Sequence, residues 1–199
     1  MRQTVTINLI RHGQTAGNIR KRYIGTTDEP LCREGIVQLM EKEYPKAEAW
    51  FLSPMKRCLE TAALADKRAE RKIIVPDFRE CDFGLFENRN YQELSDCPEY
   101  QAWIDSNGTL PFPGGEAVED FKERCCRAFE RMTEQIMEEN WSVVNAAVHG
   151  GTIMSIMERY ARPKRSYYQW HVENGGGYAL SLETENWKKE KVLYHYRRI

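Results

Sequence analysis

Short apolar runs alternate along the chain with amphipathic stretches, a pattern typical of an α/β protein. Residues 5–10 alternate apolar and polar side chains and end on a second apolar position, which predicts a short, largely buried strand. Residues 142–148 form another apolar run of strand length. Residues 116–139 carry apolar side chains at steps of three and four residues, which predicts a long helix with one core-facing stripe.

Weaker patterns fill the sequence between and after these elements. They predict helices over residues 33–44, 55–67 and 152–160 and strands over 48–52 and 72–75. The C-terminal part alternates over 178–183 and 191–196, which predicts two strands joined by a turn around 184–189. Strands and helices therefore follow one another as βα units of an open sheet.

One central segment has neither helical nor strand periodicity. Residues 78–87 are dense in aromatic and acidic side chains, and residues 90–112 hold further aromatics with few aliphatics. The run from Pro111 to Gly115 is the strongest breaker in the chain. We expect small helices and loops that lie over a site, in a lid-like insertion of about 81–115 within a single domain of residues 1–199.

Charge and cysteine content exclude several functional classes. The 199 residues carry 29 basic and 30 acidic side chains, so no overall field attracts nucleic acid or an anionic membrane. No apolar run reaches the length of a membrane span and the N-terminus shows no signal peptide, so we expect a soluble cytoplasmic protein. The 6 cysteines include no Cys-x-x-Cys pair, which predicts free thiols and no structural zinc.

Two histidines occupy equivalent places at predicted strand ends. His12 follows the first strand, between Arg11 and Gly13, and His149 follows the strand over 142–148, directly before Gly150. The carboxyl ends of parallel strands meet at one edge of a sheet, where ligand sites form, so we expect the two imidazoles face to face. A single histidine in this place is as readily structural, but the repeated setting favours a site.

The side chains around these histidines suit a phosphate. Arg11 directly follows the first strand, and Arg57 lies in the first turn of a helix one βα unit later. A guanidinium can donate hydrogen bonds to two phosphate oxygens at once, and the amide of Asn18 can turn back toward the same anion. Arg57 alone is also consistent with an ion pair to Glu60 at the surface.

Further charged groups receive separate interpretations. Carboxylates among Phe78, Phe83 and Phe86 are candidates for partial desolvation, which raises a carboxyl pKa toward use as a proton donor. Taken alone, the segment is also consistent with a charged loop. In the long helix, acid-first spacing one turn apart predicts ion pairs of Asp120 with Arg124 and of Glu123 with Arg127. His171 and His195 lack a strand-end setting and are predicted to be structural or surface groups.

Other phosphate chemistries find no support in the sequence. Cys125 and Arg131 match the Cys-x5-Arg spacing of cysteine phosphatases, but they fall within the predicted long helix rather than a glycine-containing loop. The chain has no Asp-x-Asp for an aspartyl-phosphate or paired-metal mechanism, and no glycine-rich nucleotide-binding motif.

Taken in order, the motifs resemble those of the histidine phosphatase superfamily, in the branch that includes cofactor-dependent phosphoglycerate mutases. The resemblance extends from about residue 5 to 183 and rests on residues 11–18, 23–31, 53–62, 80–87 and 149–151. It implies a three-layer α/β/α sandwich with a mostly parallel central sheet and a small lid insertion over the carboxyl edge of the strands.

The resemblance also implies a role for each site residue. His12 would be the nucleophile that becomes phosphorylated, and Glu80 would protonate the leaving oxygen. Because the attacking nitrogen must be unprotonated, we also expect a neighbour, a backbone carbonyl, to fix the tautomer of His12. Arg11, Arg57 and His149 would hold the phosphoryl oxygens. The implied substrate-binding residues are Arg11, Asn18, Gly25, Arg57, Glu80, His149 and Gly150, with no metal and no cofactor.

Within the superfamily, the chain is most similar to α-ribazole phosphatases of cobalamin biosynthesis, through residues 23–31, 82–84 and 112–116. Two departures bear on the substrate: Cys32 stands where Thr or Ser is usual, and Asn88 where glycine is usual. Tyr91, Trp103 and Phe112 are candidates to stack on a heterocycle, or to pack in the core of the lid.

We therefore expect a metal-independent phosphomonoesterase that acts on a small phosphorylated metabolite through phosphohistidine. One alternative is a phosphoglycerate mutase, against which the short chain argues, since a mutase must protect its phosphoenzyme from water. Another is a regulatory protein that binds a phosphorylated ligand without turnover, against which the full set of catalytic residues argues. The sequence leaves the oligomeric state open, a homodimer included.

Overall fold

A six-stranded mixed sheet forms the centre of the molecule, in a computed structural model that describes residues 4–199. The strands are β1 (Thr4–Arg11), β2 (Ala49–Leu52), β3 (Lys72–Ile74), β4 (Val143–Val148), β5 (Gly177–Glu183) and β6 (His195–Arg198). Their spatial order is β3-β2-β4-β1-β5-β6. The pairs β3–β2, β2–β4 and β4–β1 are parallel, whereas β5 runs antiparallel to β1 and to β6.

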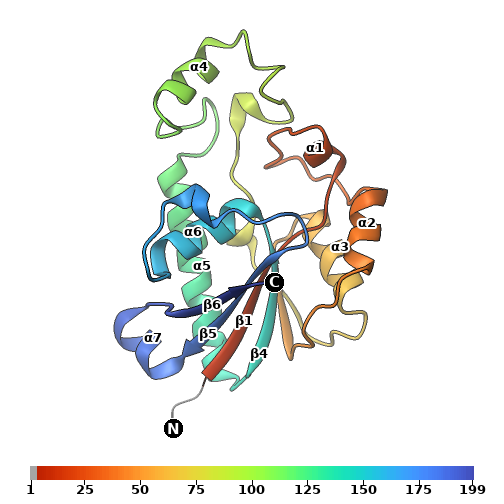
Figure 1. Ribbon diagram of the computed structural model, residues 1–199, viewed down its shortest axis with the longest axis vertical. Coiled ribbons are helices and arrows are strands. Elements are labelled where there is room, and N and C mark those ends of the chain that lie inside the picture. The colour runs from red at the N-terminus through yellow and green to blue at the C-terminus, as the bar shows by residue number, and fades with distance from the viewer. Residues whose placement is uncertain (1–3) are drawn as a thin grey trace.

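Helices cover both faces of this sheet (Figure 1). They are α1 (Ala16–Ile19), α2 (Arg33–Met40), α3 (Lys56–Ala65), α4 (Pro98–Asp105), α5 (Val118–Glu138), α6 (Gly150–Tyr160) and α7 (Thr184–Glu190). Helices α2 and α3 lie on one face, and α5 and α6 lie on the other. The structure confirms the three-layer α/β/α arrangement and the mostly parallel sheet.

The side chains of β1 alternate between the two faces of the sheet and pack against both helical layers. Val5, Ile7 and Leu9 pack into the large apolar cluster on the side of α5 and α6, whereas Ile10 packs into the cluster on the side of α3. Asn8 is fully buried, and its Nδ2 donates to Oδ1 of an asparagine on β4 at 2.8 Å. Both faces of β1 are thus covered, as expected for a central strand of an α/β sheet.

The insertion of residues 81–115, which we call the lid, stands over the carboxyl edge of the parallel strands (Figure 1). It contains α4 and a short 3-10 helix, Gly84–Phe86. It has an apolar cluster of its own, in which Phe86, Trp103 and Phe112 pack together with Phe121 of α5. Burial of these large aromatic surfaces holds the lid against the N-terminal end of α5.

The C-terminal part differs from the prediction. The residues expected to form a turn form α7 instead, which buries Thr184 and Trp187 and ends at Lys191 with φ of 48°. The last strand begins at His195 rather than at residue 191. A helix this short buries too few side chains to leave a periodic apolar pattern in the sequence. Among residues 4–199, no helix combines the length and the apolar character needed to cross a bilayer.

Candidate active site

The register of β1 and β4 brings the two strand-end histidines together. Arg11 is paired with Val148 in the parallel ladder, so the residues that follow them lie next to each other at the same edge of the sheet. The ring centroids of His12 and His149 lie 5.2 Å apart, with an angle of 67° between the ring planes. The two imidazoles are therefore neighbours at the carboxyl edge of the sheet.

A backbone carbonyl fixes the tautomer of His12, as the sequence led us to expect. The Nδ1 atom lies 2.7 Å from the carbonyl oxygen of Gly13. A carbonyl can only accept, so Nδ1 carries the proton and Nε2 keeps its lone pair. Burial, together with the positive charges of Arg57 and Arg11, lowers the pKa of His12 well below its usual range. The neutral imidazole can act as a nucleophile through Nε2.

Arg57 and His149 are fully buried, and the ring of His149 packs next to His12. The Nε atom of Arg57 donates to Nδ1 of His149 at 3.3 Å, so Nε2 of His149 carries the proton and donates to Oγ of Ser53 at 2.7 Å. The other guanidinium nitrogens of Arg57 donate to backbone carbonyls of residues 24–27. Burial, and then the charge of Arg57, lower the pKa of His149 well below its usual range.

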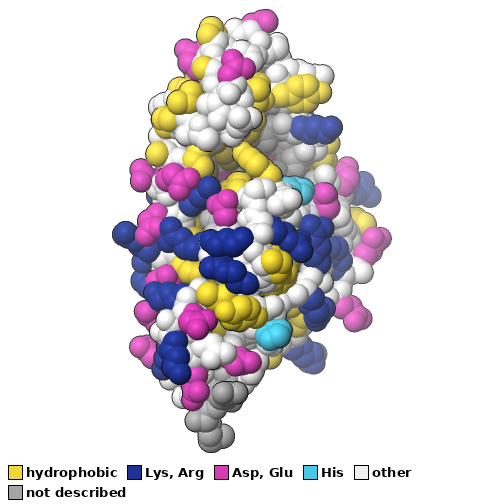
Figure 2. Space-filling view, turned by 60° about the vertical axis from the view of Figure 1, so that its left-hand side comes forward, with side chains coloured by type: hydrophobic (Ala, Val, Ile, Leu, Met, Phe, Trp, Pro, Cys, Tyr) yellow, Lys and Arg dark blue, Asp and Glu magenta, His cyan; other side chains and the backbone are white. Residues whose placement is uncertain are grey.

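A cavity of about 300 Å³ opens between the lid and the sheet edge. Five of the residues expected at the site line it, namely Arg11, His12, Asn18, Glu80 and Gly150. Much of the remaining wall is aromatic, contributed by Tyr23, Phe83, Trp103, Phe112, Phe121, Tyr167 and Tyr168. In the space-filling view, hydrophobic side chains are exposed on the lid and at the hollow beneath it, whereas Lys and Arg side chains gather on the face below (Figure 2).

The cavity contains donors suited to an anion. Nε of Arg11 is buried without a hydrogen-bond partner among residues 4–199, whereas its Nη1 donates to the carbonyl of Val172 at 2.7 Å. A Cβ on Gly150 would lie 3.4 Å from this Nε, so glycine avoids further crowding of the buried donor. The Oδ1 of Asn18 accepts from Nδ2 of Asn174 at 3.1 Å, which orients the Asn18 amide with its own Nδ2 left to donate. These groups can hold phosphate oxygens.

Glu80 lines the same cavity with a carboxyl group held at both oxygens. Its Oε1 accepts from the backbone N–H of Cys81 at 3.0 Å, and its Oε2 accepts from that of Gly151 at 3.2 Å. Burial raises the pKa of Glu80, although these hydrogen bonds and the nearby arginines oppose the effect. A carboxyl group in such a place can give a proton to a leaving oxygen.

Three of the expected site residues do not line the cavity. Arg57 and His149 have their polar atoms bound to other groups of the protein, as described above. The amide of Gly25 donates to Oε1 of Glu87 at 2.8 Å, and its carbonyl accepts from Arg57 at 3.0 Å. A Cβ on Gly25 would lie 1.8 Å from the carbonyl oxygen of Cys81. Gly25 therefore occupies a position of close packing between its loop and the lid.

His171 is exposed, as the prediction of a structural or surface group allowed, but it also lines the cavity, which sequence reasoning did not foresee. Its Nε2 lies 3.2 Å from Nη1 of Arg11, so it accepts a hydrogen bond from the guanidinium. Burial and the charge of Arg11 lower the pKa of His171. It reaches the site from the segment after the 3-10 helix Tyr167–Trp170, where no motif marks it.

The lid aromatics separate into two groups. Trp103 and Phe112 line the cavity and also belong to the apolar cluster of the lid, with ring centroids 5.4 Å apart. Tyr91 is 55% exposed and does not line the cavity. Of the three rings considered for stacking, two are thus placed to touch a ligand.

The two departures from the family pattern have local explanations. Cys32 is the N-cap of α2, and its Sγ accepts from the amide of Gly35 at 3.4 Å, the role that Thr or Ser would fill. Asn88 has φ of 56°, in the left-handed region that glycine favours and asparagine tolerates better than most residues. Neither residue lines the cavity.

Comparison with known proteins agrees with this geometry. A family model described as the histidine phosphatase superfamily (branch 1) matches residues 7–194. The chain is 32% identical over 168 residues to phosphoglycerate mutase-like protein 4 of Arabidopsis thaliana, which covers 79% of this chain and 71% of that protein. It is 29% identical over 194 residues to the adenosylcobalamin/alpha-ribazole phosphatase of Salmonella typhimurium. This match covers 93% of this chain and 94% of that protein.

A solved structure shows the same fold. The alpha-ribazole phosphatase from Shigella flexneri superimposes with a TM-score of 0.77 over 95% of this chain and 93% of that chain, at 24% identity. The chain therefore belongs to the histidine phosphatase superfamily and is a phosphomonoester hydrolase of that class.

Proposed function

We propose that this protein hydrolyses a small phosphomonoester through a phosphohistidine formed on Nε2 of His12, without a metal. The observation that carries the proposal is the 2.7 Å contact of His12 Nδ1 with the carbonyl of Gly13, in a cavity shared with the unpaired Nε of Arg11. The first supplies an unprotonated nucleophile, and the second a fixed positive charge for the phosphoryl group.

The reaction proceeds in two transfers. Nε2 of His12 attacks phosphorus, the bond from phosphorus to the ester oxygen breaks, and Glu80 gives its proton to the departing oxygen. A water then attacks the phosphohistidine, Glu80 takes the proton of that water, and the phosphorus–nitrogen bond breaks to release phosphate. Negative charge spread over the phosphoryl oxygens is stabilised by donors that are already in place, here Arg11 and Asn18.

Arg57 and His149 act from buried positions near His12. Burial, and then the permanent charge of Arg57, lower the pKa of His12 and keep its imidazole neutral before attack, and the charge of Arg57 also favours the incoming phosphate. Direct contact of either side chain with a phosphoryl oxygen requires exchange of a present partner, such as Ser53 for Nε2 of His149. Their proposed role as phosphoryl ligands therefore includes a small rearrangement on substrate binding.

For the substrate, we favour α-ribazole 5′-phosphate or a close analogue, handled in the cytoplasm. The aromatic wall of the cavity supports this choice, because planar rings such as Trp103 and Phe112 can contact the flat face of a heterocycle. The name of the Salmonella relative points in the same direction.

A phosphoglycerate mutase is the second candidate, favoured by the name of the Arabidopsis relative. A phosphoglycerate carries a carboxylate in addition to its phosphate, which calls for a second cationic group. Apart from Arg11, the only Arg or Lys in the described lining is Arg22, and its Nη2 already pairs with Oε1 of Glu93 at 2.5 Å. The cavity therefore favours an organic monoester with an uncharged remainder.

The deciding experiment compares kcat/KM for α-ribazole 5′-phosphate, ribose 5-phosphate and 3-phosphoglycerate, with release of inorganic phosphate as the readout. Ribose 5-phosphate is the matched control, since it lacks the aromatic base. We expect it to be about tenfold poorer, the effect of one to two ring contacts. Equal values for the two ribosyl substrates would contradict the substrate, and formation of 2-phosphoglycerate faster than phosphate release would favour the mutase.

A further inference from the structure

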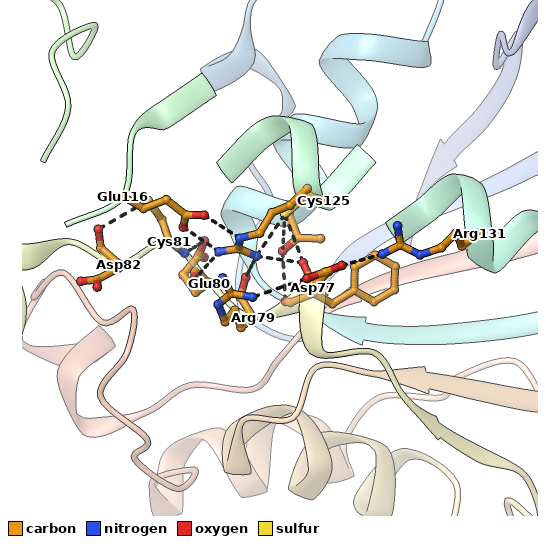
Figure 3. Close-up of polar contacts among 11 residues, drawn as sticks. Asp77, Arg79, Glu80, Cys81, Asp82, Glu116, Cys125 and Arg131 are labelled. Carbon is orange, nitrogen blue, oxygen red and sulfur yellow. Dashed lines mark hydrogen bonds and ion pairs between the residues drawn. The ribbon is translucent and has the colours of Figure 1, made fainter. Parts of the chain in front are cut away.

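The proposed mechanism does not use a cluster of polar contacts at the base of the lid, which includes Glu116 and the segment around Glu80 (Figure 3). Arg124 makes most of these contacts. It lies near the N-terminal end of α5, and its side chain is only 13% exposed. Its Nε and Nη2 donate to the two carboxyl oxygens of Glu116 at 2.6 and 2.7 Å. The sequence predicted a helical pair with Asp120, but Asp120 is exposed and Arg124 reaches back toward the lid instead.

The same guanidinium holds the backbone that carries the acid. Nη1 donates to the carbonyls of Asp77 and Arg79, each at 2.8 Å, and Nη2 donates to the carbonyl of Glu80 at 3.0 Å. Residues 79–83 lie outside any helix or strand, so no ladder of backbone hydrogen bonds fixes them. Arg124 therefore supplies the fixed donors that a regular element would otherwise provide.

The two segments by which the chain enters and leaves the lid lie next to each other at this cluster. The amide of Glu116 donates to the carbonyl of Asp82 at 2.9 Å, which joins the end of the lid to its start. A Cβ on Gly115 would lie 2.4 Å from the same Asp82 oxygen, so the two segments touch. Glu116 thus places Arg124, and Arg124 places the main chain of Glu80.

We propose that Arg124, held by Glu116, is a positioning residue that sets where the carboxyl group of Glu80 lies relative to the leaving oxygen. This inference rests on the proposed role of Glu80 as the general acid. Within residues 4–199, the one backbone donor to Oε2 of Glu80 is the N–H of Gly151, at 3.2 Å. A shift of the Glu80 main chain therefore moves the acid away from the substrate while leaving His12 and Arg11 on β1 in place.

An ion pair that only stabilises the fold would behave differently. Loss of such a pair lowers the concentration of folded enzyme and affects all substrates alike. Loss of a group that positions the acid slows substrates in proportion to how much their leaving oxygen needs a proton. The dependence of rate on the leaving group therefore separates the two roles.

The test compares Arg124→Met with Arg127→Met, which removes an exposed arginine of the same helix that pairs with Glu123. Rates are measured on an alkyl phosphate and on p-nitrophenyl phosphate. We expect Arg124→Met to slow the alkyl ester by about 100-fold, the cost of a 1 Å misplacement, and the nitrophenyl ester by much less. Arg127→Met should match the wild type on both esters. Equal losses on both esters for Arg124→Met would overturn the proposal.

Combining Arg124→Met with Glu80→Gln tests the positioning role of Arg124 separately from the proposed role of Glu80 as the general acid. If Arg124 acts through Glu80, adding Arg124→Met to Glu80→Gln causes no further selective loss on the alkyl ester. Additive losses would overturn the positioning role while leaving Glu80 as the acid. A Glu80→Gln variant with equal losses on both esters would instead contradict the proposed acid. If Arg124→Met does not fold, Arg124→Lys, which keeps the charge but not the planar fork, carries the same comparison.

Discussion

His12 and His149 lie with their ring centroids 5.2 Å apart, although they come from distant parts of the chain. Each follows a strand of the same parallel pair, and both are buried, with pKa values well below the usual range. Two imidazoles this close cannot both be charged without strong repulsion. Both rings are therefore neutral, with Nε2 of His12 unprotonated and His149 anchored by Ser53 and Arg57.

Replacement of the proposed nucleophile gives the most direct prediction. His12→Ala should lower phosphate release on the order of 10⁴-fold or more, because the variant lacks the imidazole on which the covalent intermediate is proposed to form. Wild-type enzyme quenched during turnover in alkali should carry an acid-labile phosphoryl group that the variant lacks. His195→Ala, which removes an exposed histidine on β6, is the matched control and should retain activity. Normal turnover by His12→Ala would end the phosphohistidine proposal.

Replacement of the proposed acid should depend on the substrate. Glu80→Gln keeps the shape and acceptor oxygen of the side chain but removes the proton, so an alkyl phosphate should react about 10² to 10⁴ times more slowly. Nitrophenyl phosphate should be affected far less, since its leaving group needs little protonation. The readout is the ratio of kcat values for the two esters. An unchanged ratio would remove Glu80 from the acid role.

Gly150 offers a test of the anion site that leaves the fold intact. In Gly150→Ala the new methyl group would lie 3.4 Å from Nε of Arg11, in van der Waals contact with this buried, unpaired donor, and would hinder the approach of an anion to it. Alanine also favours a helix start more than glycine, so thermal stability should be kept or slightly raised. We expect KM for phosphomonoesters and the inhibition constant of inorganic phosphate to rise about tenfold, the loss of one charge-assisted hydrogen bond. Unchanged phosphate inhibition would place the anion elsewhere.

The buried histidines predict how stability depends on pH. The folded-state pKa of His149 lies well below 6.5, so below that pH the unfolded chain binds a proton that the folded one does not. The free energy of unfolding should then fall by about 1.4 kcal/mol per pH unit for this imidazole as pH decreases from its unfolded pKa toward its folded one. His149→Gln should flatten the decline by that amount in urea unfolding, whatever its effect on absolute stability. A decline in His149→Gln as steep as in the wild type would contradict a neutral buried ring.

Local patterns were sufficient to predict the sheet edge and much of the candidate site. Strand periodicity followed by Arg11-His12 and by His149-Gly150 implied two side chains at one edge, and the parallel register of β1 and β4 places them there. The same reasoning could not find His171, because only the path of the chain after α6 brings it to Arg11. It also could not show that Arg57 is buried against a loop rather than exposed in the cavity, since that depends on the fold of residues 24–27.

The pairing of Arg124 shows a further limit of local rules. Helical spacing alone favours Asp120, one turn away, and the structure does form the analogous pair of Glu123 with Arg127. Arg124 binds Glu116 instead, because the carbonyls of residues 77–80 lie within reach of the remaining donors. A bidentate, largely buried arrangement with several acceptors outweighs an exposed helical pair.

The wall of the cavity and the core of the lid are built from the same rings. Trp103, Phe83 and Phe112 pack against one another and also face the space where a substrate would lie. Enlarging the cavity at any of these positions removes packing that keeps the lid folded, at a cost of about 3–5 kcal/mol for a large aromatic residue changed to alanine. Evolution toward bulkier esters is therefore easier through Met154 or Tyr168, which border the cavity outside that core.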